Sequence, residues 1–176
     1  MIKKLLYTFL AISFLVTPQI GFGAKEKAKD KKKGGKHPML TIETTYGNVE
    51  IELYPEEAPN TVARISELAK QGFYNGLTFH RVVPGFVVQG GDPKGNGTGG
   101  SGKKLKAEFN SRKHTEGTLA MARAQDPDSA DSQFYISLGT HPHLDNQYTV
   151  FGQVTKGIEA VKQIKMGDKM VKVTVK

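Results

Sequence analysis

Apolar and polar residues begin to alternate along the chain at Met39. The segment MLTIETTYGNVEIELY holds two alternating runs, with the turn Tyr46-Gly47-Asn48 between them. A period of two on both sides of a short glycine-containing turn predicts a β-hairpin. Six further short apolar runs, bounded by glycine, proline or polar residues, predict six more strands: LTFHRVV, FVVQGG, GTLAMAR, SQFYISL, YTVFGQV and KMVKVTVK.

Two segments have helical spacing instead. In APNTVARISELAKQG the apolar residues share one helical face, Asn60 is the candidate N-cap, and Gly72 ends the helix. The segment GIEAVKQIK predicts a short second helix before the last strand. The elements lack the βαβ alternation of a parallel sheet, and many short antiparallel strands need closure to hide their edges. We therefore expect a mainly β fold over residues 39–176, a closed eight-stranded antiparallel β-barrel capped by two α-helices.

The first 24 residues have the three parts of a secretory signal. A short positive start, MIKK, precedes the twelve-residue apolar run LLYTFLAISFLV, and GFGA then supplies small residues. This order predicts a signal peptide over residues 1–24 with cleavage near Gly23-Ala24, and hence export to the periplasm or secretion. The alternative is an uncleaved anchor, although the apolar run is short for a membrane-spanning helix.

Residues 25–38 form a Lys-rich segment, KEKAKDKKKGGKHP. It contains seven lysines and no apolar residue larger than alanine, so it cannot bury enough surface to order itself. We expect a flexible tether that acts as a solvated spacer. The alternative is weak adhesion to an anionic membrane or cell-wall polymer.

The charge and the cysteine content exclude several classes of function. The formal net charge is +8, of which residues 1–24 carry +2 and residues 25–38 carry +5, so that +1 remains for residues 39–176. A nearly neutral domain gives little electrostatic support for nucleic-acid binding. The absence of cysteine excludes disulfides, thiolate nucleophiles and sulfur-ligated metals.

The glycine-rich segment GDPKGNGTGGSGKK fits parts of two phosphate-binding patterns. A phosphate loop needs a helix that opens directly after it, because the helix N-terminus binds the anion. The following segment KLKAEFNSRKH has no sustained apolar helical stripe, and Lys104 stands where the hydroxyl residue of a P-loop belongs. We therefore interpret the segment as a tight loop whose glycines let the backbone lie close to a ligand.

Two other patterns are incomplete. His141 and His143 could suggest a metal site, but only Asp145 lies nearby in the sequence as a further ligand. Ser132 and Ser137 with a histidine could suggest a hydrolase, but neither serine lies in a nucleophile elbow. We expect no metal and no cofactor.

Two segments hold the candidate chemistry. FHRVVPGFVVQGGDP places a guanidinium, an aromatic ring and an amide on one short strand pair, and MARAQDPDSADSQFYIS joins two strands by a polar loop. Taken alone, these residues are compatible with a surface cation, a core ring and a polar edge. Together with GTGGSG, GTLAMARA and LDNQYTVFGQV, however, they resemble the cyclophilins, which are peptidyl-prolyl cis/trans isomerases. The resemblance runs from about Met39 to the C-terminus, with the motifs in family order.

The resemblance implies a set of site residues. Arg81 would be the catalytic cation, and Gln89 would hold polar groups of the substrate backbone. The other substrate-binding residues implied are Phe86, Val87, Phe134 and Leu144 in an apolar proline pocket, Ala122 and Arg123 against the residues before the proline, Gln133 on the neighbouring strand, and His143 and Tyr148 at the rim.

The function expected from the resemblance is isomerisation of X-Pro bonds in exported proteins, by a monomer whose partners are unfolded or extended polypeptides that contain proline. The alternative is a chaperone-like module that binds such segments without turnover. The best-known eukaryotic pattern has Trp, Asn, His and Met where this chain has His143, Arg123, Tyr148 and Val87. These differences bear on tight cyclosporin binding more than on catalysis.

Overall fold

The computed structural model of the protein describes residues 37–176. The predicted signal peptide, and the predicted tether up to residue 36, lie outside the described residues. Among residues 37–176, no helix is both long enough and apolar enough to cross a membrane.

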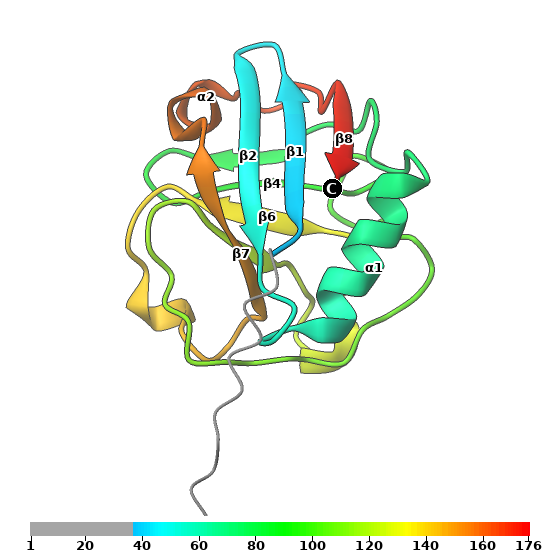
Figure 1. Cartoon of the computed structure of the whole chain (residues 1–176), viewed down its shortest axis with the longest axis vertical. Coiled ribbons are helices and arrows are strands. Elements are labelled where there is room, and N and C mark those ends of the chain that lie inside the picture. The colour runs from blue at the N-terminus through cyan, green and yellow to red at the C-terminus, as the bar shows by residue number, and fades with distance from the viewer. Residues whose placement is uncertain (1–36) are drawn as a thin grey trace, which may run out of the picture. The chain divides into compact units, whose positions relative to one another are not determined.

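Eight antiparallel strands form one curled sheet (Figure 1). The sheet order is β3-β4-β6-β5-β7-β2-β1-β8. The hairpin β1–β2 lies across β4 and β6, which run in a different direction in Figure 1. The strands are β1 (Met39–Thr44), β2 (Gly47–Leu53), β3 (Arg81–Val83), β4 (Val87–Gly90), β5 (Thr118–Met121), β6 (Phe134–Ser137), β7 (Val150–Lys156) and β8 (Lys172–Val175).

The sheet is a curled half-barrel, so the prediction of a closed barrel is not confirmed. The two end strands, β3 and β8, are only three and four residues long and are not paired with each other. The segments that precede them meet instead in a single bridge between Thr78 and Lys169. There the Phe79 N–H donates to the Asp168 carbonyl at 2.8 Å. The contact between the two ends of the sheet is therefore irregular backbone pairing, which a strand pattern in the sequence does not predict.

Both predicted helices are present, as α1 (Pro59–Lys70) and α2 (Ile158–Gln163). The predicted N-cap of α1 was wrong, because the helix already begins at Pro59 and Ala58 occupies the cap position without a side-chain bond. A distant carboxylate takes over the role: Glu108 accepts the backbone N–H groups of Asn60 and Thr61, each at 2.9 Å. Two short 3-10 helices, η1 (Pro127–Ser129) and η2 (Pro142–Leu144), lie in the connections around β6.

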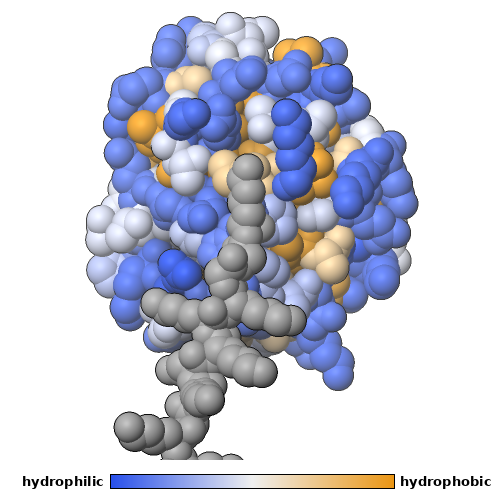
Figure 2. Space-filling view, viewed as in Figure 1, coloured by the Kyte–Doolittle hydropathy of each residue, from blue (hydrophilic) through white to orange (hydrophobic). Residues whose placement is uncertain are grey.

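The apolar side chains form a large core between the curled sheet and the helices and a small second cluster. The large core includes the buried residues of β1 and β2 and the face of α1 that carries Val62, Ile65 and Leu68. The second cluster consists of Val87, Ala120, Tyr135, Leu144 and Val150. The face in Figure 2 is mainly hydrophilic with separate hydrophobic patches, as expected when most apolar surface is buried. The second cluster lies beside the candidate site.

Candidate active site

The β3–β4 hairpin presents the only arginine of its two strands beside an amide. Arg81 pairs with Gln89 in the strand register, and its Nη1 donates to Gln89 Oε1 at 3.4 Å. The guanidinium carbon lies 5.7 Å from the centre of the Phe86 ring. Arg81 is exposed, so its charge remains available at the mouth of the site.

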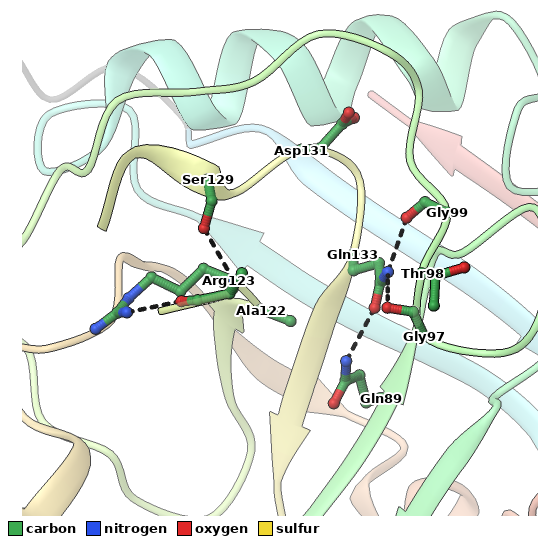
Figure 3. A pocket seen from close by; sticks show the side chains of 10 residues that line it. Gln89, Gly97, Thr98, Gly99, Ala122, Arg123, Ser129, Asp131 and Gln133 are labelled. Atoms are coloured by element: carbon green, nitrogen blue, oxygen red, sulfur yellow. Dashed lines mark hydrogen bonds between the residues drawn. The ribbon is translucent and has the colours of Figure 1, made fainter. Parts of the chain in front are cut away.

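The amide of Gln89 is itself held in place (Figure 3). Its Nε2 donates to Gln133 Oε1 at 3.0 Å, and Gln133 Nε2 donates to the carbonyls of Gly97 and Gly99 at 3.1 and 2.8 Å. These bonds form a relay from the glycine-rich loop through two glutamines to Arg81. The two loop carbonyls can only accept, so the amide nitrogen of Gln133 faces them and its oxygen faces Gln89. The oxygen of Gln89 is then turned toward Arg81, which restricts the orientation of the guanidinium.

The glycine-rich loop is organised around Asp92, which is buried. Its carboxylate accepts the backbone N–H groups of Lys94, Asn96 and Gly97 at 2.8, 3.0 and 2.6 Å. Burial raises the pKa of Asp92, but the backbone donors outweigh this effect and hold the pKa below its ordinary value. The N–H groups that a phosphate would need already bind this carboxylate. The structure therefore agrees with the interpretation of a loop that borders the site.

A pocket of about 220 Å³ opens beside Arg81, and we name it the apolar pocket after the cluster side chains in its wall. The second apolar cluster supplies Val87, Tyr135 and Leu144 to its wall. The pocket is lined by nine residues in all: Arg81, Phe86, Val87, Gln89, Ala122, Arg123, Tyr135, Leu144 and Tyr148. Eight of these were predicted as site residues, and the structure brings all eight together.

A second pocket of about 300 Å³ adjoins the first and shares Gln89, Ala122 and Arg123 with it (Figure 3). Gln133, a predicted site residue, lines this second pocket together with the carbonyl-bearing loop at 97–99. The two pockets thus form one continuous cleft, with the side chains of the second apolar cluster at one end and the loop carbonyls at the other.

The prediction for Phe134 was wrong. Its side chain is fully buried in the large core, with its ring centre 5.5 Å from that of Tyr74. Successive side chains of an extended segment point to opposite faces, so Gln133, just before β6, and Tyr135 on β6 face the cleft and Phe134 does not. Tyr135 takes the predicted position of Phe134 in the pocket wall. The sequence contained the signal for this: side chains alternate between the two faces of a strand, so the residue two positions after Gln133, Tyr135, shares its face.

His143 lies at the edge of the site and does not line either pocket. Its side chain is exposed, and its ring stacks on that of Phe86 with centres 6.0 Å apart and planes 19° from parallel. The neighbouring His141 is bound to the backbone through an Nε2 contact of 3.0 Å with the Phe86 carbonyl. Among residues 37–176, no group of three or more His, Asp or Glu side chains is placed to hold a metal ion.

A buried polar network behind the pocket was not predicted from the sequence. The His114 Nδ1 lies 3.1 Å from Asp145 Oδ1, and its Nε2 lies 2.9 Å from the hydroxyl of Tyr135. Burial lowers the pKa of His114, and Asp145 only partly offsets this. Because a carboxylate can only accept, Nδ1 carries the hydrogen of the neutral ring and the Tyr135 hydroxyl donates to Nε2. The network fixes the ring of Tyr135 in the pocket wall.

Residues 39–176 match the model of the cyclophilin type peptidyl-prolyl cis-trans isomerase family. The chain is a cyclophilin. It is 53% identical over 129 residues to peptidyl-prolyl cis-trans isomerase B of Bacillus subtilis, a match that covers 72% of this chain and 90% of that protein. A peptidyl-prolyl cis-trans isomerase of Helicobacter pylori is 48% identical over 137 residues, which are 76% of this chain and 83% of the relative.

Solved cyclophilins share the fold. A cyclophilin type isomerase of Cryptosporidium parvum has a TM-score of 0.74 at 28% identity, covering 80% of this chain and 97% of that one. A structure of the same type from that organism in the presence of the dipeptide Ala-Pro has a TM-score of 0.68 at 28% identity, covering 78% and 96%. Family and relatives together make this cyclophilin an enzyme, a peptidyl-prolyl cis-trans isomerase.

Proposed function

We propose that this cyclophilin accelerates the folding of exported proteins, by rotating X-Pro bonds in the apolar pocket while Arg81 polarises the prolyl amide. The single observation that carries the proposal is the position of Arg81, which lies at the mouth of an apolar pocket and is oriented by the two-glutamine relay. The Ala-Pro dipeptide of the Cryptosporidium parvum structure supports a ligand that contains proline.

The only charged group that the proposed step requires is one positioned cation. Conjugation of the nitrogen lone pair with the carbonyl gives the peptide bond a rotational barrier of about 18–20 kcal/mol. A donor to the prolyl nitrogen localises that lone pair and weakens the conjugation. Arginine suits this role, because it stays charged and holds a planar fork of donors. No nucleophile, metal or proton transfer takes part in the proposed step.

Arg81 cannot supply the whole acceleration. A millionfold rate increase corresponds to about 8 kcal/mol, whereas one hydrogen bond to a charged group contributes about 1.5–3 kcal/mol. The remainder must come from the pocket, where Val87, Tyr135 and Leu144 exclude water and favour the twisted, less polar amide.

The exported part of the proposal rests on residues 1–24. Their positive start, apolar run and small residues are those of a secretory signal. Mass spectrometry of the protein from the native cell tests this part. The expected result is a chain that starts near Ala24 in the periplasmic or external fraction, and an intact chain retained inside the cell would contradict it.

An isomerisation assay with an Ala-Pro peptide tests the mechanism. Arg81→Ala should lower kcat/KM by at least about tenfold, the share of one charged hydrogen bond. Arg81→Lys should fall in between, because it keeps the charge and loses the planar fork. The matched control is Lys172→Ala, which removes an exposed strand cation away from the cleft.

The melting temperature of Arg81→Ala should equal that of the wild type, because the side chain is exposed and makes one long hydrogen bond. Full activity in a folded Arg81→Ala protein would refute the role of the cation. Peptide binding without turnover in the wild type would favour the alternative of a binding module.

A further inference from the structure

The charges along the cleft are unequal. Two arginines, Arg81 and Arg123, line the apolar pocket, and no carboxylate lines it. The neighbouring pocket adds one carboxylate, Asp131, whose oxygens accept the backbone N–H groups of Ser101 and Gly102 and the Ser101 hydroxyl. The pocket beside Arg81 therefore carries a positive potential.

Arg123 lies where the two pockets meet, because it lines both of them. Its guanidinium is directed away from Gln133 in Figure 3. The side chain binds backbone carbonyls: Nε and Nη2 donate to Gln147 at 3.1 and 2.9 Å, and Nη1 donates to Ala124 and Gln125 at 2.9 and 3.0 Å. It also lies over Tyr148, with 4.7 Å from the guanidinium carbon to the ring centre.

These partners fix the position of Arg123 without neutralising its charge. Within the described part of the chain, no Asp or Glu oxygen forms an ion pair with it. The acidic residues before and in η1 bind backbone donors, since Asp126 accepts the N–H of Asp128 and Asp128 accepts the N–H of Ala107, both at 2.9 Å. A fixed, unpaired cation acts on a ligand without first losing conformational freedom.

We infer that Arg123 makes this cyclophilin prefer substrates with an acidic residue beside the target proline over substrates with a basic one. The inference rests on the proposed function, which places the proline in the apolar pocket; the residues beside the proline then lie along the cleft that Arg123 lines. A glutamate there meets a cation whose hydrogen bonds already hold it in place. A lysine there meets two like charges, and Asp131, the one carboxylate of the neighbouring pocket, already accepts three donors.

A peptide series with Glu, Gln or Lys in place of the residue before proline measures the preference, and a second series varies the residue one position earlier. In the wild type, kcat/KM should be higher for Glu than for Lys by about three- to tenfold in one of the series, the range of one or two exposed charge pairs. The ratio should shrink as the salt concentration rises from about 0.01 to 1 M, because salt screens exposed charges.

Two variants separate charge from structure. Arg123→Gln should remove most of the Glu-over-Lys ratio, whereas Arg123→Lys should keep most of it, although both lose hydrogen bonds to the carbonyls of Gln147 and Ala124. Lys172→Gln is the matched control for loss of one cation elsewhere. A merely structural role of Arg123 would change the rates for all peptides together and leave the ratio and its salt dependence unchanged.

The outcomes distinguish this inference from the proposed function. If no proline peptide is turned over, the proposed function fails. If the peptides are turned over with equal efficiency for Glu and Lys in both series, the inference is overturned and the function stands. The inference is also overturned if the ratio survives in Arg123→Gln, or if Arg123→Lys loses it as fully as Arg123→Gln does.

Discussion

Replacement of Tyr135 by phenylalanine tests the buried network behind the pocket. The change keeps the aromatic ring in the pocket wall and removes only the hydroxyl, which donates to His114 Nε2 at 2.9 Å. His114 is fully buried, with its Nδ1 held by Asp145, so no other described residue offers Nε2 a donor. Tyr135→Phe therefore leaves one buried acceptor without a partner.

The size of the effect follows from the loss of one buried hydrogen bond. A buried polar group without its partner costs about 1–3 kcal/mol of the free energy of unfolding. For a domain of this size each kcal/mol lowers the melting temperature by about 2–4 °C, so we expect a loss of about 2–12 °C. The value of kcat/KM should change little, because Tyr135 contributes its ring to the pocket and its hydroxyl points to His114.

Urea unfolding and the isomerisation assay measure the two effects on the same variant. Tyr148→Phe is the matched control, since Tyr148 lines the same pocket and its hydroxyl makes no hydrogen bond to the described residues. The control should change the free energy of unfolding by less than about 0.5 kcal/mol. Equal stability of Tyr135→Phe and the control would refute the network. A large fall in kcat/KM for a stable Tyr135→Phe protein would instead show that the hydroxyl acts on the substrate.

Two further predictions concern stability. Glu108→Ala should lower the free energy of unfolding by about 1–2 kcal/mol in urea titrations, because it removes the cap of α1, and Glu108→Gln should lose less because its amide oxygen still accepts. The fold should lose stability as the pH falls below 6.5, the ordinary pKa of a histidine. In the unfolded chain His114 then binds a proton, whereas in the folded chain burial lowers its pKa and keeps the ring neutral. A further loss is expected below pH 3.8, where the unfolded chain protonates Asp92 and Asp145 and the folded chain, with both pKa values lowered, does not. A flat stability profile between pH 7 and 5 in His114→Gln, but not in the wild type, would assign the first loss to His114.

The pattern of the sequence predicted most of the fold because its elements are local. Each strand and both helices are defined by periodicity within about a dozen residues, and the structure has them in the predicted segments. Features that join distant segments were missed. The cap of α1 comes from Glu108, which lies 48 positions from Asn60. The contact between the two ends of the sheet is likewise a long-range feature, because it is a bridge between Thr78 and Lys169. Spacing within a segment contains no information about either.

The site divides in the same way. Residues of the β3–β4 hairpin were predicted together and lie together, because one turn fixes their register. The error at Phe134 was avoidable, since strand alternation from Gln133 already places Tyr135 on the same face. The partners of Tyr135 were not predictable from spacing, because His114 and Asp145 belong to loops that meet only in the folded chain.

One strand therefore connects the two halves of the site. On β6 and the residue before it, Gln133 belongs to the relay that orients Arg81, and Tyr135 belongs to the buried network that fixes the pocket wall. Phe134, between them, packs in the large core. A shift of this segment by one residue would exchange the two faces and remove the relay and the pocket wall together. The pairing of Gln89 with Tyr135 in the β4–β6 register holds both halves in place, so the geometry around the prolyl bond depends on the core as much as on the residues that meet the substrate.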